Sequence, residues 1–236
     1  MMDWKKKLGF IVPSWNTVME YECQRMAPEG VSVHFTRVDH GIGAEKQVEE
    51  VPQLAELLGH ANLDAICFGC TVASFVRPGI DQEISEIIEQ KTNVPATTTT
   101  TAIIQALREM DVSRLALASP YRQELNDRLI QFLDGYGFEV TRERGLNIRG
   151  ASFLPPEEVE ALAREVDTPD ADAILISCTN IRSLEVIDQL EADLGKPVLT
   201  SNAAALWYTL RVAGFEEPAT AGGTLLRDHL STVSHP

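Results

Sequence analysis

The sequence has little positive charge and no long apolar run. Lysine and arginine number 20 against 35 aspartate and glutamate residues, which gives a formal net charge of −15. A field of this sign repels nucleic acid and anionic membrane surfaces. No stretch approaches the roughly 18 to 20 apolar residues that span a bilayer, and no basic segment leads into an apolar run near the N-terminus. We therefore expect a cytoplasmic protein with no nucleic-acid or membrane partner.

The sequence also lacks the usual signatures of metal, nucleotide and disulfide sites. Four cysteines in 236 residues do not make a disulfide scaffold, so they are treated as thiols. Cys67 and Cys70 form a CxxC motif, but no second pair accompanies it and the five histidines are not spaced for zinc. There is no P-loop or HExxH motif, and the GIG at 41–43 lacks the third glycine of a dinucleotide site. The sequence predicts no metal and no cofactor.

What the sequence does contain is an alternation of short apolar segments with amphipathic ones. LGFIV at 8–12 and VSVHFTRV at 31–38 have the character of strands, whereas 47–61 has helical periodicity. Apolar residues make up 44% of the chain, as in ordinary globular proteins. This alternation is typical of an α/β protein with parallel sheets.

The second half of the chain repeats the motifs of the first half in the same order. DAICFGCT at 64–71 returns as DAILISCT at 172–179, and two further pairs, Pro13 with Pro120 and Pro95 with Pro197, follow at similar offsets. A near-constant offset predicts a duplicated structural unit.

We therefore predict two pseudosymmetric α/β lobes, each with a mainly parallel sheet flanked by helices. The first lobe is 1–110 and contains Cys70, and the second is 111–236 and contains Cys178. Elements near 98–110 and 201–214 are expected to cross between the lobes. The C-terminal segment STVSHP is expected to be a frayed tail.

The repeated cysteines are candidates for catalysis. Ligands of open α/β sheets bind beyond the carboxyl ends of the strands, where Cys70 and Cys178 are both predicted to lie. Oriented N–H groups at a helix N-terminus lower a thiol pKa, so one sulfur is expected to act as thiolate and the other as acid. The alternative is that both are small buried apolar side chains. Cys23 and Cys67 are assigned to the core.

The loops that carry these cysteines are rich in side chains that can hold carboxylates by neutral hydrogen bonds, without arginine. Each of these side chains also suits a helix N-cap, and the two roles are compatible. The candidates are Ser14, Asn16, Thr71, Thr98, Thr99, Tyr121, Thr179, Asn180, Ser201 and Asn202.

Five motifs together resemble maleate cis-trans isomerase, in the Asp/Glu racemase superfamily that also contains arylmalonate decarboxylase and hydantoin racemase. They are GFIVPSWNT, FGCTVASF, TTTTTA, SPYRQELND and ISCTN, and the resemblance runs from about Leu8 to Gly214. It implies two lobes that bury a small dicarboxylate between two cysteines, without a cofactor, in a homo-oligomer. The implied roles are Cys70 as nucleophile, Cys178 as opposing acid/base, and carboxylate binding by Asn16, Tyr121 and the amides around Thr71, Val72 and Thr179.

Two positions of this chain differ from the motifs of the family that it resembles. Trp15 interrupts the first motif, and Asn147 is the candidate for a further asparagine expected after Tyr121. Arylmalonate decarboxylase has glycine in the first cysteine motif, so Cys70 argues against decarboxylation.

We expect cis-trans isomerisation of maleate or a related cis-dicarboxylate through covalent addition of a cysteine thiolate. Two alternatives stay open: a two-thiol racemase of an amino acid, hydantoin or related carbon acid, and a non-catalytic module that binds small acids.

Overall fold

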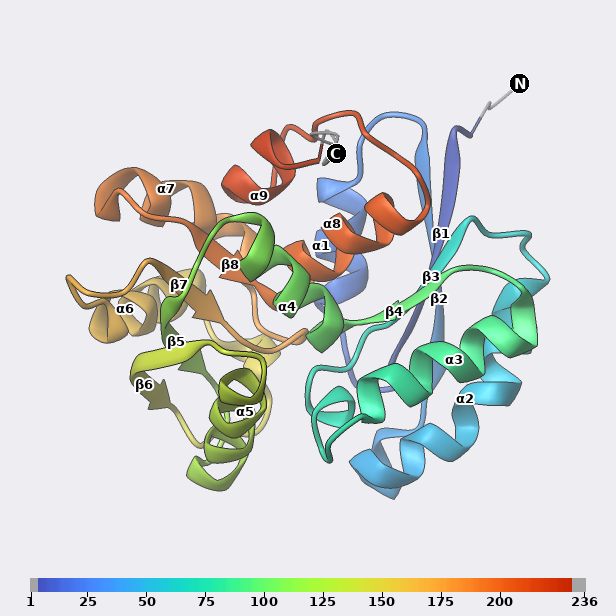
Figure 1. The fold of residues 1–236 in the computed structure, drawn as a ribbon, viewed down its shortest axis with the longest axis horizontal. Coiled ribbons are helices and arrows are strands. Elements are labelled where there is room, and N and C mark those ends of the chain that lie inside the picture. Colours follow the sequence, from blue (N-terminus) through green and yellow to red (C-terminus); the bar gives the residue numbers. More distant parts are fainter. Residues whose placement is uncertain (1–3, 231–236) are drawn as a thin grey trace.

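Two parallel sheets of four strands form the framework of the computed structural model, which describes residues 4–230 (Figure 1). The strand order is β2-β1-β3-β4 in one sheet and β6-β5-β7-β8 in the other, so the two sheets have the same topology. The predicted α/β class and the predicted duplication are confirmed. The segment STVSHP, for which a frayed tail was predicted, lies outside the described residues.

The first sheet has β1 as one of its two central strands. Strands β2 and β3 pair with β1 on either side, which explains why 8–12 is a nearly continuous apolar run. The strands are β1 (Lys6–Pro13), β2 (Val31–Val38), β3 (Ala65–Phe68) and β4 (Ala96–Thr98). The connecting helices and 3-10 turns are α1 (Met19–Met26), η1 (His40–Ile42), α2 (Ala44–Gly59), η2 (Val72–Ser74) and α3 (Ile80–Thr92).

The second sheet repeats this arrangement around β5, which pairs with β6 and β7. Its strands are β5 (Arg114–Ser119), β6 (Glu139–Gly145), β7 (Ala173–Ile176) and β8 (Val198–Thr200). The connecting elements are α5 (Gln123–Gly135), η3 (Ala151–Phe153), α6 (Pro156–Val166), α7 (Leu184–Leu194) and α9 (Gly223–Asp228). Among residues 4–230, no helix combines the length and the apolar character needed to cross a membrane.

Helices α4 (Thr99–Glu109) and α8 (Ser201–Val212) lie between the two sheets and pack against each other (Figure 1). Each begins directly after a strand, and the hydroxyls of Thr98 and Thr200 accept hydrogen bonds from backbone N–H groups in their first turns. One hydrophobic cluster contains buried residues of both halves, for example Ile103, Leu117 and Leu206. The two helices therefore join the lobes.

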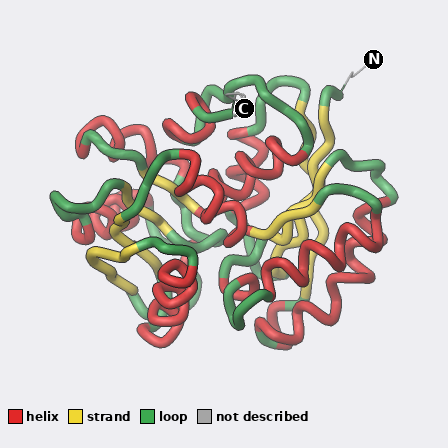
Figure 2. The backbone as a smooth tube through the Cα atoms, viewed as in Figure 1, coloured by secondary structure: helices red, strands yellow, loops and turns green. Residues whose placement is uncertain are grey.

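The carboxyl ends of both sheets converge on the junction, where loops lie between the two groups of strands (Figure 2). The Asn16 side-chain amide donates to the hydroxyl of Thr179 at 3.0 Å, and that hydroxyl donates to the Gly69 carbonyl at 3.2 Å. The hydroxyls of Thr71 and Ser201 are also hydrogen-bonded, at 3.2 Å. These contacts hold the strand-end loops of one half against those of the other.

Candidate active site

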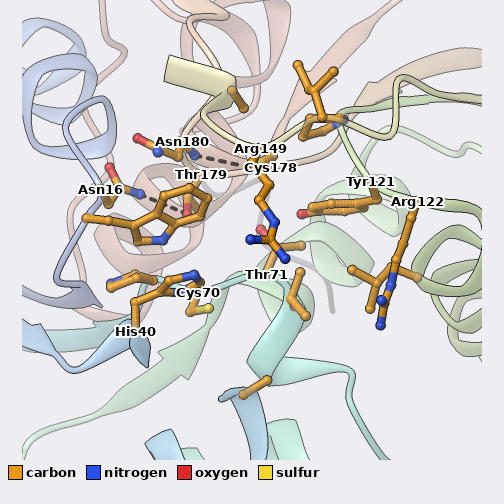
Figure 3. Close-up of a pocket in the computed structure, with 18 of the residues that line it drawn as sticks. Asn16, His40, Cys70, Thr71, Tyr121, Arg122, Arg149, Cys178, Thr179 and Asn180 are labelled. Carbon is orange, nitrogen blue, oxygen red and sulfur yellow. Dashed lines mark hydrogen bonds between the residues drawn. The ribbon is translucent and has the colours of Figure 1, made fainter. Parts of the chain in front are cut away.

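A cavity of about 440 Å³ lies where the strand-end loops of the two halves meet (Figure 3). Both repeated cysteines line it, and the thiols come from equivalent strand ends because Cys70 follows β3 and Cys178 follows β7. The predicted site residues that line the cavity are Asn16, Cys70, Thr71, Val72, Tyr121, Cys178, Thr179 and Asn180, and Asn147 lines it as well.

The other two cysteines are in the core, as predicted. Cys23 and Cys67 are fully buried, and Cys67 lies within β3, where Phe10 and Thr97 are its strand neighbours. The CxxC motif therefore places only its second cysteine, Cys70, in the cavity.

The structure contradicts the predicted lowering of the thiol pKa values. Burial raises the pKa of Cys70 to about 12 and that of Cys178 to about 11. The backbone N–H groups of Ala73 and Val72 lower the pKa of Cys70, and the backbone N–H of Asn180 lowers the pKa of Cys178. Desolvation raises both pKa values by more. The reason is local: a short 3-10 turn follows Cys70, and α7 begins only at Leu184, so neither thiol sits at the N-terminus of an α-helix.

Two hydrogen-bond donors beside the thiols have no partner among the described residues. Asn180 accepts from the Thr17 backbone N–H at 3.0 Å, which leaves its amide Nδ2 free, and the buried Tyr121 hydroxyl is also without a partner. An unpartnered buried donor costs about 1–3 kcal/mol. Because both residues line the cavity, these groups are suited to hydrogen-bond a ligand with acceptor oxygens.

Five of the predicted binding residues lie outside the cavity lining: Ser14, Thr98, Thr99, Ser201 and Asn202. Ser14 is exposed and its hydroxyl accepts from the backbone N–H of His40 at 3.2 Å. Asn202 is fully buried and its amide donates to Glu22 at 2.6 Å, because the first turn of α8 faces α1. Both follow strands as predicted, but position after a strand does not fix the direction of a side chain.

The cavity also contains basic side chains that the sequence motifs did not reveal. His40, Arg122 and Arg149 line it, whereas no aspartate or glutamate does, although the chain has 35 of them. The His40 ring stacks on Trp15 with 4.3 Å between ring centroids, and burial lowers the pKa of this histidine. An acidic protein with an acid-free, arginine-containing cavity is suited to an anionic ligand.

The sequence motifs did not reveal Gln47 either. It lies on α2, within a segment whose periodicity indicates only a helix, yet it is buried, lines the cavity and has an unpartnered carbonyl oxygen. Within residues 4–230, no group of three His, Cys, Asp or Glu side chains is arranged to hold a metal ion.

Comparison with known proteins places the chain in a family. The model of the arylmalonate decarboxylase family matches residues 8–226. The chain belongs to this family. It is 30% identical to the arylmalonate decarboxylase of Bordetella bronchiseptica, over 91% of this chain and 93% of that protein. It is 27% identical to the maleate isomerase of Nocardia farcinica, over 94% of this chain and 96% of that protein.

Members of the arylmalonate decarboxylase family share the fold described above. The structure matches the crystal structure of the maleate isomerase Iso from Pseudomonas putida S16 with a TM-score of 0.89, at 26% identity, covering 94% of this chain and 98% of that one. The resemblance drawn from the five motifs is confirmed, and the fold is of the Asp/Glu racemase type. The chain is an enzyme whose relatives include both isomerases and a decarboxylase.

Proposed function

We propose that this enzyme isomerises maleate, or a related cis-dicarboxylate, to the trans isomer without a cofactor. The observation that carries the proposal is the pair of thiols, Cys70 and Cys178, that enter one acid-free cavity from equivalent ends of the two sheets. Relatives named maleate isomerase, aligned over nearly the whole chain, support it.

Cys70 acts as the nucleophile in this proposal. After its proton leaves to solvent, its sulfur bonds to one alkene carbon while the π electron pair takes a proton from the Cys178 thiol at the other carbon. The former double bond is then single and rotates. Cys178, now a thiolate, removes a proton from the same carbon, the carbon–sulfur bond breaks, and the trans isomer leaves with Cys70 again a thiolate.

The negative charge that develops on the substrate during addition spreads into the neighbouring carboxylate. The Tyr121 hydroxyl and the Asn180 side-chain amide Nδ2 are fixed donors for it. Donors already oriented toward a developing charge need no reorganisation during reaction, and each contributes roughly 10²- to 10³-fold to rate. The raised thiol pKa values mean that both thiols are protonated at neutral pH before substrate binds.

Decarboxylation of an arylmalonate is the second candidate, because a decarboxylase is among the relatives at 30% identity. Isomerisation is favoured because Cys70 occupies the position at which the resemblance implies a glycine in that enzyme.

Proton NMR in deuterated water tests the proposal with maleate, phenylmalonate, aspartate, glutamate and a hydantoin as separate substrates. We expect fumarate from maleate. Phenylacetate formed from phenylmalonate, without fumarate formation from maleate, would favour the decarboxylase, and deuterium at the α-carbon of an amino acid or hydantoin would favour a racemase.

Cysteine variants test the assigned roles in the same assay. Cys70→Ser and Cys178→Ser are each expected to lower turnover by roughly 10³-fold or more. Cys67→Ala is the matched control, since this thiol lies in the core beside the site and does not line the cavity. A Cys70→Ser variant with full turnover would remove the nucleophile assignment.

A further inference from the structure

We propose that the substrate is a cis-butenedioate bearing a third anionic group, and that Arg149 binds this group. The inference rests on the proposed isomerase function and names its substrate class. Three observations carry it: the size of the cavity, the number of neutral donors beside the thiols, and the placement of Arg149.

The cavity is larger than maleate requires. Its volume of about 440 Å³ lies in the roughly 300–1,000 Å³ range of sites that enclose drug-sized ligands. A four-carbon diacid has only eight non-hydrogen atoms and leaves much of this space unfilled. The remaining wall includes Leu125, Ile148 and Ala151 from the second half of the chain, as well as Trp15, Ala44 and Gln47 from the first half. Arg149 lies among the second-half residues of this wall.

Neutral donors beside the thiols are enough for two carboxylates. Tyr121 and Asn180 each offer an unpartnered buried donor, and the Asn16 amide, which donates one N–H to Thr179, has a second N–H for a ligand. The arginines are additional to this set.

Arg149 is the arginine suited to a ligand. Arg122 forms an ion pair with Glu124, with 3.4 Å between Nε and Oε2. Arg149 lines the cavity but is itself exposed, and it forms no ion pair with any acidic residue in the described part of the chain. In Figure 3 its side chain extends toward the cavity. A guanidinium offers two parallel N–H donors that match the two oxygens of a carboxylate.

The loop that carries Arg149 is hydrogen-bonded to the loop that carries Tyr121. The backbone N–H of Asn147 donates to the Tyr121 carbonyl at 3.1 Å, and that of Ile148 donates to the Pro120 carbonyl at 3.0 Å. Positive φ angles at Asn147 (52°) and Gly150 (78°) shape the chain on both sides of Arg149. The backbone that carries the Arg149 guanidinium is therefore hydrogen-bonded to the loop that carries Tyr121.

The test compares three substrates that differ only at one alkene carbon: maleate, 2-methylmaleate and 2-(carboxymethyl)maleate. We expect kcat/KM for the carboxymethyl compound to exceed that for the methyl compound by roughly tenfold to a hundredfold, the value of a charged hydrogen bond. Arg149→Met should bring this ratio of kcat/KM values close to one. Arg149→Lys should keep part of the preference, because lysine has the positive charge but lacks the two parallel N–H donors of the guanidinium.

Arg142→Met is the matched control, since Arg142 is an exposed arginine of β6 in the same half and does not line the cavity. It should leave the substrate ratio unchanged. An equal loss for all three substrates in Arg149→Met, or no preference for the carboxymethyl compound in the unmodified enzyme, overturns the inference while leaving the isomerase proposal intact.

Calorimetry with two unreactive analogues, propane-1,2,3-tricarboxylate and methylsuccinate, separates the inference from the isomerase proposal. If none of the three alkenes is turned over, the isomerase proposal fails. A preference for the tricarboxylate that Arg149→Met removes would still support the third-anion site, and equal affinity for the two analogues would overturn it.

Discussion

At the scale of single residues, burial decides the state of the two cavity thiols. Their pKa values, about 12 for Cys70 and about 11 for Cys178, are raised because few solvent dipoles reach the sulfur atoms. The free enzyme therefore protects its thiols against alkylation and oxidation, since the thiolate is the reactive form.

The first prediction concerns thiol alkylation. With iodoacetamide at pH 7.5, both thiols should react more slowly than free cysteine, and their rates should rise about tenfold per pH unit because the thiolate fraction does so below the pKa. Cys178 should react faster than Cys70, since its pKa is lower and its side chain less buried. Mass spectrometry of the peptides measures each rate. Rates that level off below pH 9 would contradict the raised pKa values.

The second prediction concerns Tyr121. Burial raises the pKa of its hydroxyl well above the ordinary value, so it stays a donor at every working pH. Tyr121→Phe should lower kcat roughly 10²- to 10³-fold, as loss of one fixed donor does. The free energy of unfolding should stay the same or rise, because an unpartnered buried hydroxyl is removed. Parallel losses in kcat and in urea-unfolding stability would indicate a structural role instead.

At the scale of helices and strands, the duplication extends to the helix caps. Thr98 caps α4 by accepting from the Thr101 N–H at 3.2 Å, and Thr200 caps α8 by accepting from the Ala203 N–H at 3.1 Å. We expect Thr98→Ala and Thr200→Ala each to lower the free energy of unfolding by about 1 kcal/mol. Urea titration measures this, with the serine variants as controls that keep a hydroxyl. Unchanged stability in both alanine variants would show that the caps contribute nothing.

Helix α1 is tied to the second half by a buried carboxylate. Glu22 accepts from the backbone N–H groups of Ser183 at 2.6 Å and Leu184 at 2.8 Å, at the start of α7, and from Asn202 on α8. Desolvation raises its pKa above the ordinary value of 4.5, and these hydrogen bonds oppose the rise. The contact holds the far end of the loop that begins at Cys178.

The pH dependence of stability tests this contact. Since the folded pKa of Glu22 is raised, its contribution is fully present below pH 4.5 and is lost as the pH rises through the folded value. Glu22→Gln removes this titration. Urea titrations between pH 4.5 and 8 should therefore show the unmodified enzyme losing stability relative to the glutamine variant as the pH rises. A constant difference across that range would mean that the pKa is not raised.

At the scale of the whole molecule, the lobes share a core. Ile103 on α4 and Leu206 on α8 belong to one cluster with the strands of the second sheet, and hydrogen bonds such as Asn16 to Thr179 join the strand-end loops. The candidate active-site cavity forms only when both halves are in place, because each half supplies part of its lining, including one cysteine.

We expect the chain to unfold in a single cooperative transition. Tryptophan fluorescence, to which the buried Trp207 of α8 contributes, and far-UV circular dichroism should give coincident urea curves. Separately expressed segments 1–110 and 111–236 should not fold alone, because each would expose one face of the α4–α8 contact. Two resolved transitions, or a folded isolated segment, would contradict this. The boundary near residue 110 stays a prediction until that experiment.

The sequence by itself determined the class of fold, the duplication and the equivalent positions of Cys70 and Cys178 in the two repeats. Apolar runs such as 8–12 mark strands that are buried on both faces, and such runs can be recognised from a few consecutive residues. The spacing of Cys70 and Cys178 in equivalent motifs placed both at strand ends, and comparison of the copies assigned Cys67 to the core. These features depend on neighbours along the chain.

Only the tertiary structure decided which polar side chains enter the cavity and how the thiols are solvated. Ser14 and Asn202 follow strands as Asn16 does, yet Ser14 is exposed and Asn202 donates to Glu22, because the turn after β1 and the first turn of α8 set the directions of these side chains. Arg149 carries no motif and reaches the cavity through a loop folded against Tyr121. The thiol pKa values depend on desolvation by both halves at once, a quantity that no local pattern records.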